Sequence, residues 1–316
     1  MDIDLGYLYF LQQLRQMMGG SLDEIFNGLS KFAVDLLPYL PYIIYWSVHK
    51  KWGMRYLTIF NIGNVLNGIV KLTVCAYRPW IRSDLIQPAG DSKVAATRYS
   101  FPSGHSTEAT SVYMTTAVWQ RNSNRKLSVA CVILLILTGF SRNYLGVHTP
   151  QDVFVGITLT SFVIFLVLWL EQKIGDNQKI YDYLTFAAFP ILVLCIVYIL
   201  NKSYPMDYID GNLIVDPVKM MPDTFKSVGA AAGFLVAAYI DRHSFHYEIP
   251  TGAPLLPLMT AGGVLILIAW KTLFGPATFL LLLGNNWGNL IIRFLFSMLG
   301  VLWWPMIITK VCAKKQ

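Results

Sequence analysis

The sequence predicts an all-α fold: a polytopic transmembrane helical bundle of about nine spans. Composition is the first reason, because 55% of the 316 residues are hydrophobic and only 14% are charged, whereas soluble domains carry about 25% charged residues. Long apolar runs are the second reason. The stretches LSVACVILLILTGF, DVFVGITLTSFVIFLVLWL and TFAAFPILVLCIVYIL approach the roughly 20 residues that cross a hydrocarbon core about 30 Å thick. These observations exclude an ordinary soluble domain.

The predicted spans follow the apolar runs in order. They cover about 30–49, 54–77, 103–120, 127–145, 150–171, 183–200, 225–241, 254–274 and 288–310. The N-terminal stretch 1–29 is predicted to be an interfacial helix that lies on the membrane. Its first twenty residues have no basic start and no long apolar core, so they do not resemble a cleaved signal peptide.

Basic residues indicate how the bundle is oriented, because short cytoplasmic loops are enriched in Lys and Arg. In the predicted topology one side holds 12 basic and 5 acidic residues, and the other side holds 13 of each. The first side therefore carries the whole net charge of +7 and is assigned to the cytoplasm. Its basic residues are Lys50, Lys51, Arg55, Arg121, Arg125, Lys126, Lys173, Lys179, Arg242, Lys310, Lys314 and Lys315. No basic stripe interleaved with aromatic residues occurs in the sequence, so we expect no nucleic-acid partner.

The four cysteines do not predict a metal site. Cys75, Cys131, Cys195 and Cys312 are far apart and mostly lie in apolar runs, without the spacing typical of metal ligands. We interpret them as packing residues, and we expect neither a metal nor a cofactor.

Three polar clusters interrupt the apolar pattern, all at the predicted outer ends of spans. The first is KLTVCAYRP, with Lys71 inside the second span and Arg78 at its end. Seven residues is close to two helical turns, so both cations are predicted to share a helix face about 10 Å apart. A lysine at that depth is usually functional, with snorkelling to the surface as the alternative. Asn61, Asn64 and Asn67 recur below it at three-residue spacing and favour interhelical hydrogen bonding.

The second cluster is SFPSGHSTE, at the start of the third span. Ser103 is suited to cap a helix there. Gly104 leaves backbone N–H groups free at the positive end of the helix dipole, which suits a phosphate. His105 then lies in the first turn. Glu108, one turn further on, is interpreted as a structural partner for a neighbouring cation.

The third cluster is SRNYLGVHTPQD, just before the fifth span. Thr149 and Pro150 have the composition of a helix start, which makes Asp152 a capping-box acid. His148 and Asp152 are four residues apart, so the carboxylate is also close enough to hold one ring nitrogen and leave the other free to attack. The two roles are compatible with each other.

The histidines differ in their predicted side of the membrane. Three of the five lie by inner loops, whereas His105 and His148 lie on the outer side. Three cations, Lys71, Arg78 and Arg142, are predicted at the same depth. Two groups for proton transfer or nucleophilic attack, together with three positive charges, are what phosphoryl transfer without a metal requires.

These residues resemble the signature of the type 2 phosphatidic acid phosphatase (PAP2) superfamily, which reads K-x6-R-P, P-S-G-H and S-R-x5-H-x3-D. All eleven specified positions match, in order and with the right internal spacing. They are Lys71, Arg78 and Pro79, then Pro102, Ser103, Gly104 and His105, then Ser141, Arg142, His148 and Asp152. The resemblance covers roughly the second to the fifth span and implies a PAP2-like helical core with a C-terminal three-helix extension.

The resemblance also implies a role for each site residue. His148 is the nucleophile that forms a phosphohistidine, and Asp152 orients and charges its ring. His105 protonates the leaving oxygen and then activates water. The phosphate oxygens are held by Lys71, Arg78, Ser103, Gly104 and Arg142. Members of the family need no metal.

The chain is predicted to have three parts. They are the interfacial helix 1–29, a PAP2-type catalytic transmembrane core 30–200, and residues 201–316 with an outer loop and three additional spans. Nine spans resemble the glucose-6-phosphatase and sphingosine-1-phosphate phosphatase branches more than six-helix bacterial members. In the extension, Gly229, Gly233 and Ala237 form a ladder of small residues suited to close helix packing. The outer loop carries four aspartates, and solvation is favoured over a role in covering the site.

The predicted function is an integral membrane phosphatase that hydrolyses a lipid phosphate monoester or diphosphate at the extracytoplasmic face through a phosphohistidine. Its expected partners are that substrate and membrane lipids. It is expected as a multi-pass protein in a bacterial plasma membrane with the site outward, or in an ER membrane with a lumenal site. A phosphatase or phosphotransferase for a soluble sugar phosphate is the alternative. A transporter or flippase is disfavoured, because the ionisable residues gather at one face and not at the midplane.

Overall fold

The computed structural model of the chain describes residues 2–90, 92, 99–209, 211–274 and 278–313. These residues fold almost entirely into helices, which confirms the all-α prediction, with one small two-stranded hairpin. Lys314 and Lys315 of the predicted cytoplasmic charge, and Asp210 of the predicted acidic loop, lie outside the described residues.

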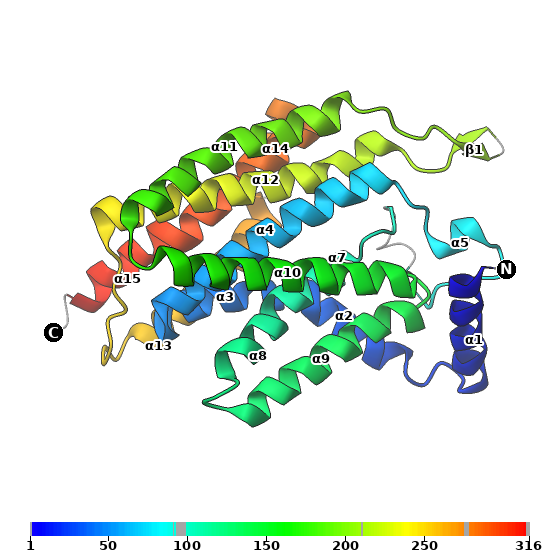
Figure 1. Cartoon of the computed structure of the whole chain (residues 1–316), viewed down its shortest axis with the longest axis horizontal. Helices are drawn as coiled ribbons and strands as arrows, with labels where there is room; N and C mark the ends of the chain where they lie inside the picture. The colour runs from blue at the N-terminus through cyan, green and yellow to red at the C-terminus, as the bar shows by residue number, and fades with distance from the viewer. Residues whose placement is uncertain (1, 91, 93–98, 210, 275–277, 314–316) are drawn as a thin grey trace. The chain divides into compact units, whose positions relative to one another are not determined.

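Figure 1 shows the helices in their order along the chain, with an extended connection between α11 and α12. In order they are α1 (Ile3–Met17), α2 (Asp23–Asp35), η1 (Leu37–Tyr39), α3 (Leu40–Ile43), η2 (Ile44–Val48), α4 (Lys50–Val74), α5 (Pro79–Arg82), α7 (Gly104–Ala109), η3 (Thr110–Met114), α8 (Thr115–Gln120), α9 (Arg125–Tyr144), α10 (Pro150–Ile174), α11 (Gln178–Asn201), α12 (Pro217–Ile240), η4 (Asp241–Phe245), α13 (Leu256–Ala269), η5 (Trp270–Phe274), α14 (Thr278–Met298), η6 (Leu299–Trp303) and α15 (Trp304–Ala313). Strands β1 (Tyr208–Ile209) and β2 (Asn212–Leu213) pair antiparallel in the connection between α11 and α12.

Among the described residues, five helical segments are long and apolar enough to cross a membrane. They are Lys50–Arg82, Arg125–Tyr144, Pro150–Ile174, Gln178–Asn201 and Leu283–Cys312. These segments confirm the predicted spans at 54–77, 127–145, 150–171, 183–200 and 288–310. The chain is therefore a multi-pass membrane protein, but the predicted count of nine spans is not confirmed.

The other four predicted spans are interrupted, short or more polar. Residues 30–49 form α2, η1, α3 and η2 instead of one helix, with Pro38 and Pro41 at the break. Residues 103–120 form α7, η3 and α8 in succession, and the segment at 254–274 contains a shorter apolar helix, Leu256–Thr272. Helix α12, at 225–241, is long but begins with charged residues.

The chain forms two compact units, each drawn from three segments. Unit 1 comprises Met1–Pro38, Leu66–Phe165 and Ser203–Met220, and unit 2 comprises Tyr39–Val65, Leu166–Lys202 and Met221–Gln316. All eight predicted site residues fall in unit 1.

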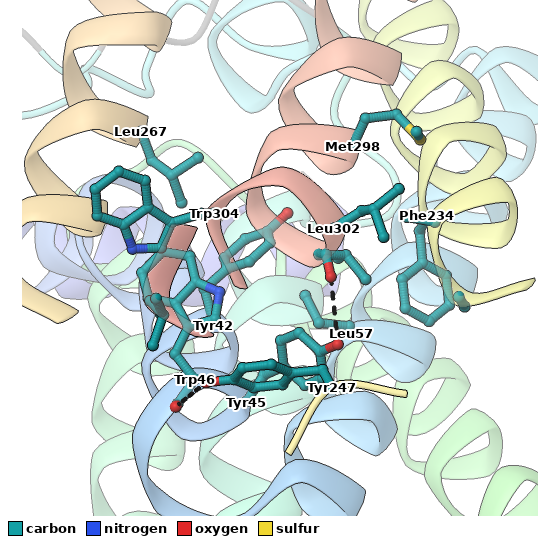
Figure 2. Close-up of a cluster of buried hydrophobic side chains, with 14 of the residues drawn as sticks. Tyr42, Tyr45, Trp46, Leu57, Phe234, Tyr247, Leu267, Met298, Leu302 and Trp304 are labelled. Carbon is teal, nitrogen blue, oxygen red and sulfur yellow. Dashed lines mark hydrogen bonds between the residues drawn. The ribbon is translucent and has the colours of Figure 1, made fainter. Parts of the chain in front are cut away.

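The core of unit 2 is built from aromatic and aliphatic side chains (Figure 2). The ring of Trp46 lies 5.8 Å from that of Tyr42 and 6.5 Å from that of Trp304. Backbone carbonyls satisfy the polar edges of these rings, as buried Trp and Tyr require. Trp46 Nε1 donates to the carbonyl of Gly300 at 2.7 Å, and the hydroxyl of Tyr247 donates to the carbonyl of Trp46 at 2.6 Å.

Helices α12 and α14 of unit 2 pack backbone to backbone, which confirms two steps of the predicted small-residue ladder. A Cβ atom added at Gly229 would lie 2.1 Å from the carbonyl oxygen of Leu290, and one added at Gly233 would lie 2.2 Å from that of Phe294. Real Cβ atoms do not come so close to backbone oxygens, so these positions require glycine. Ala237, the third step, is fully buried.

In unit 1 the N-terminal segment forms two helices that pack on the remainder of the unit. Helix α1 is joined to α5, which lies beside it in Figure 1, by an ion pair of 2.6 Å between Arg82 and Asp4. Helix α2 packs against α9, where the ring of Phe26 lies 4.6 Å from that of Tyr144 and 5.5 Å from that of Phe140. Besides the segment that carries the motifs, unit 1 thus contains the N-terminal helices α1 and α2.

Candidate active site

The capping box predicted at the start of α10 is present, and Asp152 lies at its centre. One carboxylate oxygen, Oδ2, accepts from the backbone N–H of Thr149 at 2.8 Å, and the N–H of Asp152 donates back to the hydroxyl of Thr149 at 3.4 Å. The same oxygen lies 3.2 Å from Nδ1 of His148 and accepts from the hydroxyl of Ser100. Asp152 therefore caps the helix and contacts the histidine at once.

Arg78 fixes the tautomer of the His148 ring. Its Nη1 lies 3.0 Å from Nε2 of His148. A guanidinium is always protonated and only donates, so Nε2 has to accept. The ring proton is then on Nδ1, where the carboxylate of Asp152 receives it. Nε2 is therefore the unprotonated ring nitrogen, and its lone pair faces Arg78.

The surroundings of His148 keep its ring neutral. The side chain is 2% exposed and lies between α9 and α10. Burial, together with the charges of Arg78, Arg142 and Lys71, lowers the pKa of His148 well below its usual value of 6.5. A neutral imidazole is the form that can attack phosphorus.

Arg78 reaches the site by a route that differs from the predicted one. Helix α4 ends at Val74, Cys75 has a left-handed backbone with φ 54°, and Arg78 follows in extended conformation before α5. The expectation that Lys71 and Arg78 share one helix face is therefore wrong. Arg78 is 5% exposed and its Nη1 also donates to the carbonyl of Val147 at 2.6 Å. This bond holds the guanidinium next to His148.

The start of α7 is tied to the start of α10. Ser103 is the N-cap of α7, as predicted, and its hydroxyl accepts from the N–H of Ser106 at 3.3 Å. Its own N–H donates to the carbonyl of Asp152 at 2.9 Å. Gly156 permits this approach, because a Cβ there would lie 2.9 Å from the carbonyl oxygen of Ser103. The two motif segments that carry Gly104 and His148 are therefore held side by side.

Lys71 turns toward the start of α7, which excludes snorkelling to the surface. Its Nζ donates to the carbonyl of Pro102 at 2.7 Å and to that of Tyr99 at 3.4 Å. One turn earlier in α4, Asn67 donates to the hydroxyl of Thr107 at 2.9 Å and supports the same segment.

The predicted interhelical hydrogen bonding is therefore confirmed for Asn67. It is wrong for the other two asparagines of the seam. Asn61 donates to the carbonyl of Leu57 at 2.8 Å and Asn64 to that of Phe60 at 3.0 Å, both one turn back in α4.

Arg142 is buried with an incomplete set of partners. Its Nη1 donates to the hydroxyl of Ser30, and its backbone carbonyl accepts from the N–H of His148 at 3.3 Å. Its Nε has no hydrogen-bond partner among the described residues. A buried donor without an acceptor costs about 1–3 kcal/mol. A phosphate oxygen placed beside Arg142 would remove that cost.

His105 lies in the first turn of α7. It is within electrostatic range of Arg142, His148, Arg78 and Lys71. The structure therefore gathers the predicted groups in one part of unit 1, around the starts of α7 and α10. Their roles in catalysis stay predictions.

Two serines of the site were not predicted from the sequence. Ser100 donates to Asp152 and stands two residues before the P-S-G-H motif, where no spacing rule marks it. Ser30 accepts from Arg142 across 112 residues of sequence. Only a three-dimensional arrangement identifies such a contact.

The outer loop after α11 is exposed or half-buried in most of its described residues, in agreement with the solvated interpretation, and it is also bonded to other parts of unit 1. Asp207 accepts a hydrogen bond from the hydroxyl of Tyr77, the residue next to Arg78. The ring of Tyr77 lies 6.3 Å from that of Tyr99. Val215, in the same loop, is buried.

Part of the chain is similar to known proteins. Residues 52–176 match the PAP2 superfamily. The chain is 29% identical over 166 residues to an undecaprenyl-diphosphatase of Sulfolobus acidocaldarius, covering 51% of this chain and 75% of that protein. It is 29% identical over 165 residues to phosphatidylglycerophosphatase B of Bacillus subtilis, covering 48% and 77%. It is 24% identical over 240 residues to sphingosine-1-phosphate phosphatase 2 of Mus musculus, covering 73% and 60%. No solved structure matches the chain.

The fold and the site thus define a multi-pass helical membrane protein with a cationic, histidine-containing site of the kind that handles phosphate. The segment 52–176 belongs to the PAP2 superfamily. The protein is a PAP2-type phosphatase.

Proposed function

We propose that this protein hydrolyses a lipid phosphate monoester or diphosphate at the extracytoplasmic membrane face, through a phosphohistidine on His148. The observation that carries the proposal is the state of the His148 ring. Its Nδ1 faces Asp152 and its Nε2 faces Arg78, so the nitrogen that bears the lone pair lies among the cations.

In the first step Nε2 of His148 attacks phosphorus, and the bond from phosphorus to the leaving oxygen breaks. His105 gives its proton to that oxygen. The imidazole becomes positively charged as the new P–N bond forms, and the carboxylate of Asp152 stabilises this charge at Nδ1.

In the second step His105 removes a proton from water, and the hydroxide attacks phosphorus. The P–N bond breaks, inorganic phosphate leaves and His148 regains its neutral ring. During both steps the non-bridging oxygens are held by Lys71, Arg78, Arg142, Ser103 and the backbone N–H of Gly104. Charge neutralisation by fixed cations is the main contribution that phosphoryl transfer needs from a protein.

Two further observations support a lipid substrate on the outer side. The relatives named above are phosphatases whose names specify a lipid phosphate or a polyprenyl diphosphate. The excess of Lys and Arg on the opposite loops supports a cytoplasmic position for those loops. Candidate substrates are phosphatidic acid, phosphatidylglycerophosphate, sphingoid phosphates and polyprenyl diphosphates.

The decisive experiment measures phosphate release by the purified protein from these lipids and from soluble sugar phosphates. We expect release from at least one lipid, without added metal and in the presence of EDTA. A protein that releases phosphate from glucose 6-phosphate and from none of the lipids would instead support the soluble-substrate alternative.

The chemistry is tested by trapping the intermediate. Acid-labile phosphate from a labelled substrate should bind to the wild-type protein and be absent in His148→Ala. His105→Ala should still form the intermediate from a substrate whose leaving group needs no proton. It should then hydrolyse the intermediate slowly, because water is no longer activated. His49→Ala, which removes an exposed ring bonded to the N–H of Trp52, is the matched control and should behave as wild type. Full activity in His148→Ala would refute the proposal.

A further inference from the structure

We infer that α1 is a membrane-surface anchor, and that its outward stripe of apolar residues lies in the lipid headgroup region. This places the stripe beside the catalytic turn, the segment 145–149 that carries His148. The inference rests on the proposed lipid substrate for its functional consequence. The position of α1 at the membrane surface is inferred from the exposure, contacts and direction of α1 and does not depend on the proposed function.

The stripe consists of exposed apolar residues at helical spacing. It is formed by Ile3, Tyr7, Phe10, Leu14 and Met17. These positions recur every three or four residues and so share one face of the helix. Ile3 is 95% exposed, Phe10 61% and Met17 76%. A helix surrounded by water does not gain stability from such a face, whereas a helix at a bilayer surface buries it.

The other face of α1 is already occupied by the protein. Leu5, Leu8, Leu11 and the polar residues Gln12 and Arg15 are buried. Polar bonds fix this face to the loop after α5: Gln12 accepts from the N–H of Gln87 at 2.7 Å, and Arg15 donates to the carbonyl of Gln87 at 2.9 Å. The core of unit 1 is therefore contacted by the opposite face of α1, and the outward stripe does not pack in it.

The same loop connects α1 with the catalytic turn. The N–H of Ala89 donates to the carbonyl of Leu145 at 3.0 Å. A Cβ added at Gly146 would lie 3.5 Å from both the carbonyl of Gln87 and the backbone of Pro88, so the loop packs on this turn. His148 follows two residues later. A displacement of α1 would thus be transmitted to the segment that carries His148 and the carbonyl bonded to Arg78.

The direction of α1 agrees with a position in the membrane plane. Figure 1 shows α1 running across the direction of α10, which is one of the helices long and apolar enough to span the bilayer. A helix that lies across a spanning helix at its end is parallel to the membrane surface. An apolar stripe in that position is suited to contact membrane lipid, and we propose no protein partner for the stripe.

Photolabelling tests the position of α1. The wild-type protein is placed in phosphatidylcholine vesicles with a trace of phosphatidylcholine that carries a diazirine near the glycerol. We expect label on the peptide that contains Phe10. Helix α11 is the internal standard, because its outward residues Ile191, Val193 and Leu194 are exposed on a spanning helix. Labelled α11 with unlabelled α1 would overturn the inference.

Activity tests the consequence. The double variant Phe10→Ser/Met17→Ser should lose about fivefold or more of its activity on phosphatidic acid in vesicles, because apolar area at the surface is lost. It should keep its activity on soluble p-nitrophenyl phosphate. Gln16→Ser, an exposed change on the same helix, should alter neither activity. An equal loss on both substrates, or no loss on either, contradicts the inference.

The outcomes separate the two proposals. If the wild-type protein hydrolyses no phosphate substrate, the proposed function fails while the labelling still decides the position of α1. If the stripe variant changes the oligomeric state in detergent and α1 is not labelled, a second copy occupies the stripe and the inference is wrong.

Discussion

Units 1 and 2 bury different kinds of residues. Of the 28 buried polar or charged residues in the described part of the chain, 22 lie in unit 1 and six in unit 2. In unit 1 several of these residues bond to one another, as Ser100, Thr149 and His148 do around Asp152. In unit 2 the main cluster is aromatic and aliphatic, with ring polar atoms bonded to backbone carbonyls (Figure 2).

The difference indicates what each unit is built for. A buried polar network is costly unless every group is satisfied, so it is retained where chemistry requires its groups. Apolar packing is the usual source of stability when no chemistry is required. Changes in unit 1 should therefore alter activity more than stability, and changes in unit 2 should do the reverse.

Asp152→Asn should have the largest effect on activity. The amide keeps the size of the carboxylate but places an NH₂ group among three donors, and it cannot stabilise a charged His148 ring. By analogy with the aspartate of a Ser-His-Asp triad, kcat should fall on the order of 10⁴-fold. Phosphate release under saturating substrate is the measurement.

The control for this prediction is Asp216→Asn. Asp216 also accepts a backbone N–H at a helix start, from Val218 at 3.0 Å, but it lies outside the site. Its loss should leave kcat within about twofold of wild type, as expected for a surface change. A similar fall in both variants would mean that capping and not catalysis is what Asp152 supplies.

The parts of the site that depend on local spacing were predictable from sequence. His148 and Asp152 are four residues apart at a helix start, so both the cap and the histidine contact follow from helical geometry. Ser103 as an N-cap is local in the same way. Eight site residues were named from motifs, and all fall in unit 1.

The rest depends on long-range contacts or on backbone breaks that carry no periodic signal. Ser30 meets Arg142 only because α2 packs on α9 through Phe26. The span predicted at 30–49 failed because hydropathy averages over Pro38 and Pro41, which break the helix into short turns. The route of Arg78 was missed because Cys75 adopts a left-handed backbone, which a non-glycine residue rarely does.

Gly233→Ala should be the most damaging small change in unit 2. The added methyl would meet the carbonyl oxygen of Phe294 at 2.2 Å, so α12 and α14 have to separate. We expect a loss of stability of about 3 kcal/mol, at the upper end for overpacking because the obstacle is backbone. The apparent Tm in detergent is the measurement, and the activity per folded molecule should be retained.

Gly262→Ala supplies the comparison within unit 2. The nearest atom to the new methyl is a ring carbon of Trp304 at 3.7 Å, an ordinary contact. Alanine is favoured over glycine in a helix by about 1 kcal/mol, so the Tm should hold or rise. Equal losses in the two variants would show that the helix contact seen at Gly233 does not determine stability.

Ser30→Ala should reduce kcat/KM by about tenfold, because Arg142 loses an acceptor that orients its guanidinium. The decisive measurement is a double-mutant cycle. In an Arg142→Ala background the Ser30 change should have no further effect, since its action passes through Arg142.

Ser128→Ala is the matched control for Ser30, because its hydroxyl also makes one side-chain hydrogen bond within unit 1. In this bond Ser128 donates to the carbonyl of Ala117 at 2.8 Å. It should leave kcat/KM within about twofold of wild type. If the losses of kcat/KM from the Ser30 and Arg142 changes are additive, Ser30 does not act through Arg142. It would then be only a packing residue of α2.

The smallest expected effect is a shift in the pH profile. Burial and the nearby cations lower the pKa of His148, so the ring takes up a proton only well below pH 6.5, and the acid limb of kcat/KM from this group should lie there. Arg78→Met removes one of these cations and should move the limb to higher pH by up to about one unit. Arg82→Met, which breaks the pair with Asp4, should leave the limb unmoved. The substrate is the same in all three proteins, so its own ionisation does not affect the comparison. If the limb of Arg78→Met stays at the wild-type pH, the charge of Arg78 does not influence the pKa of His148.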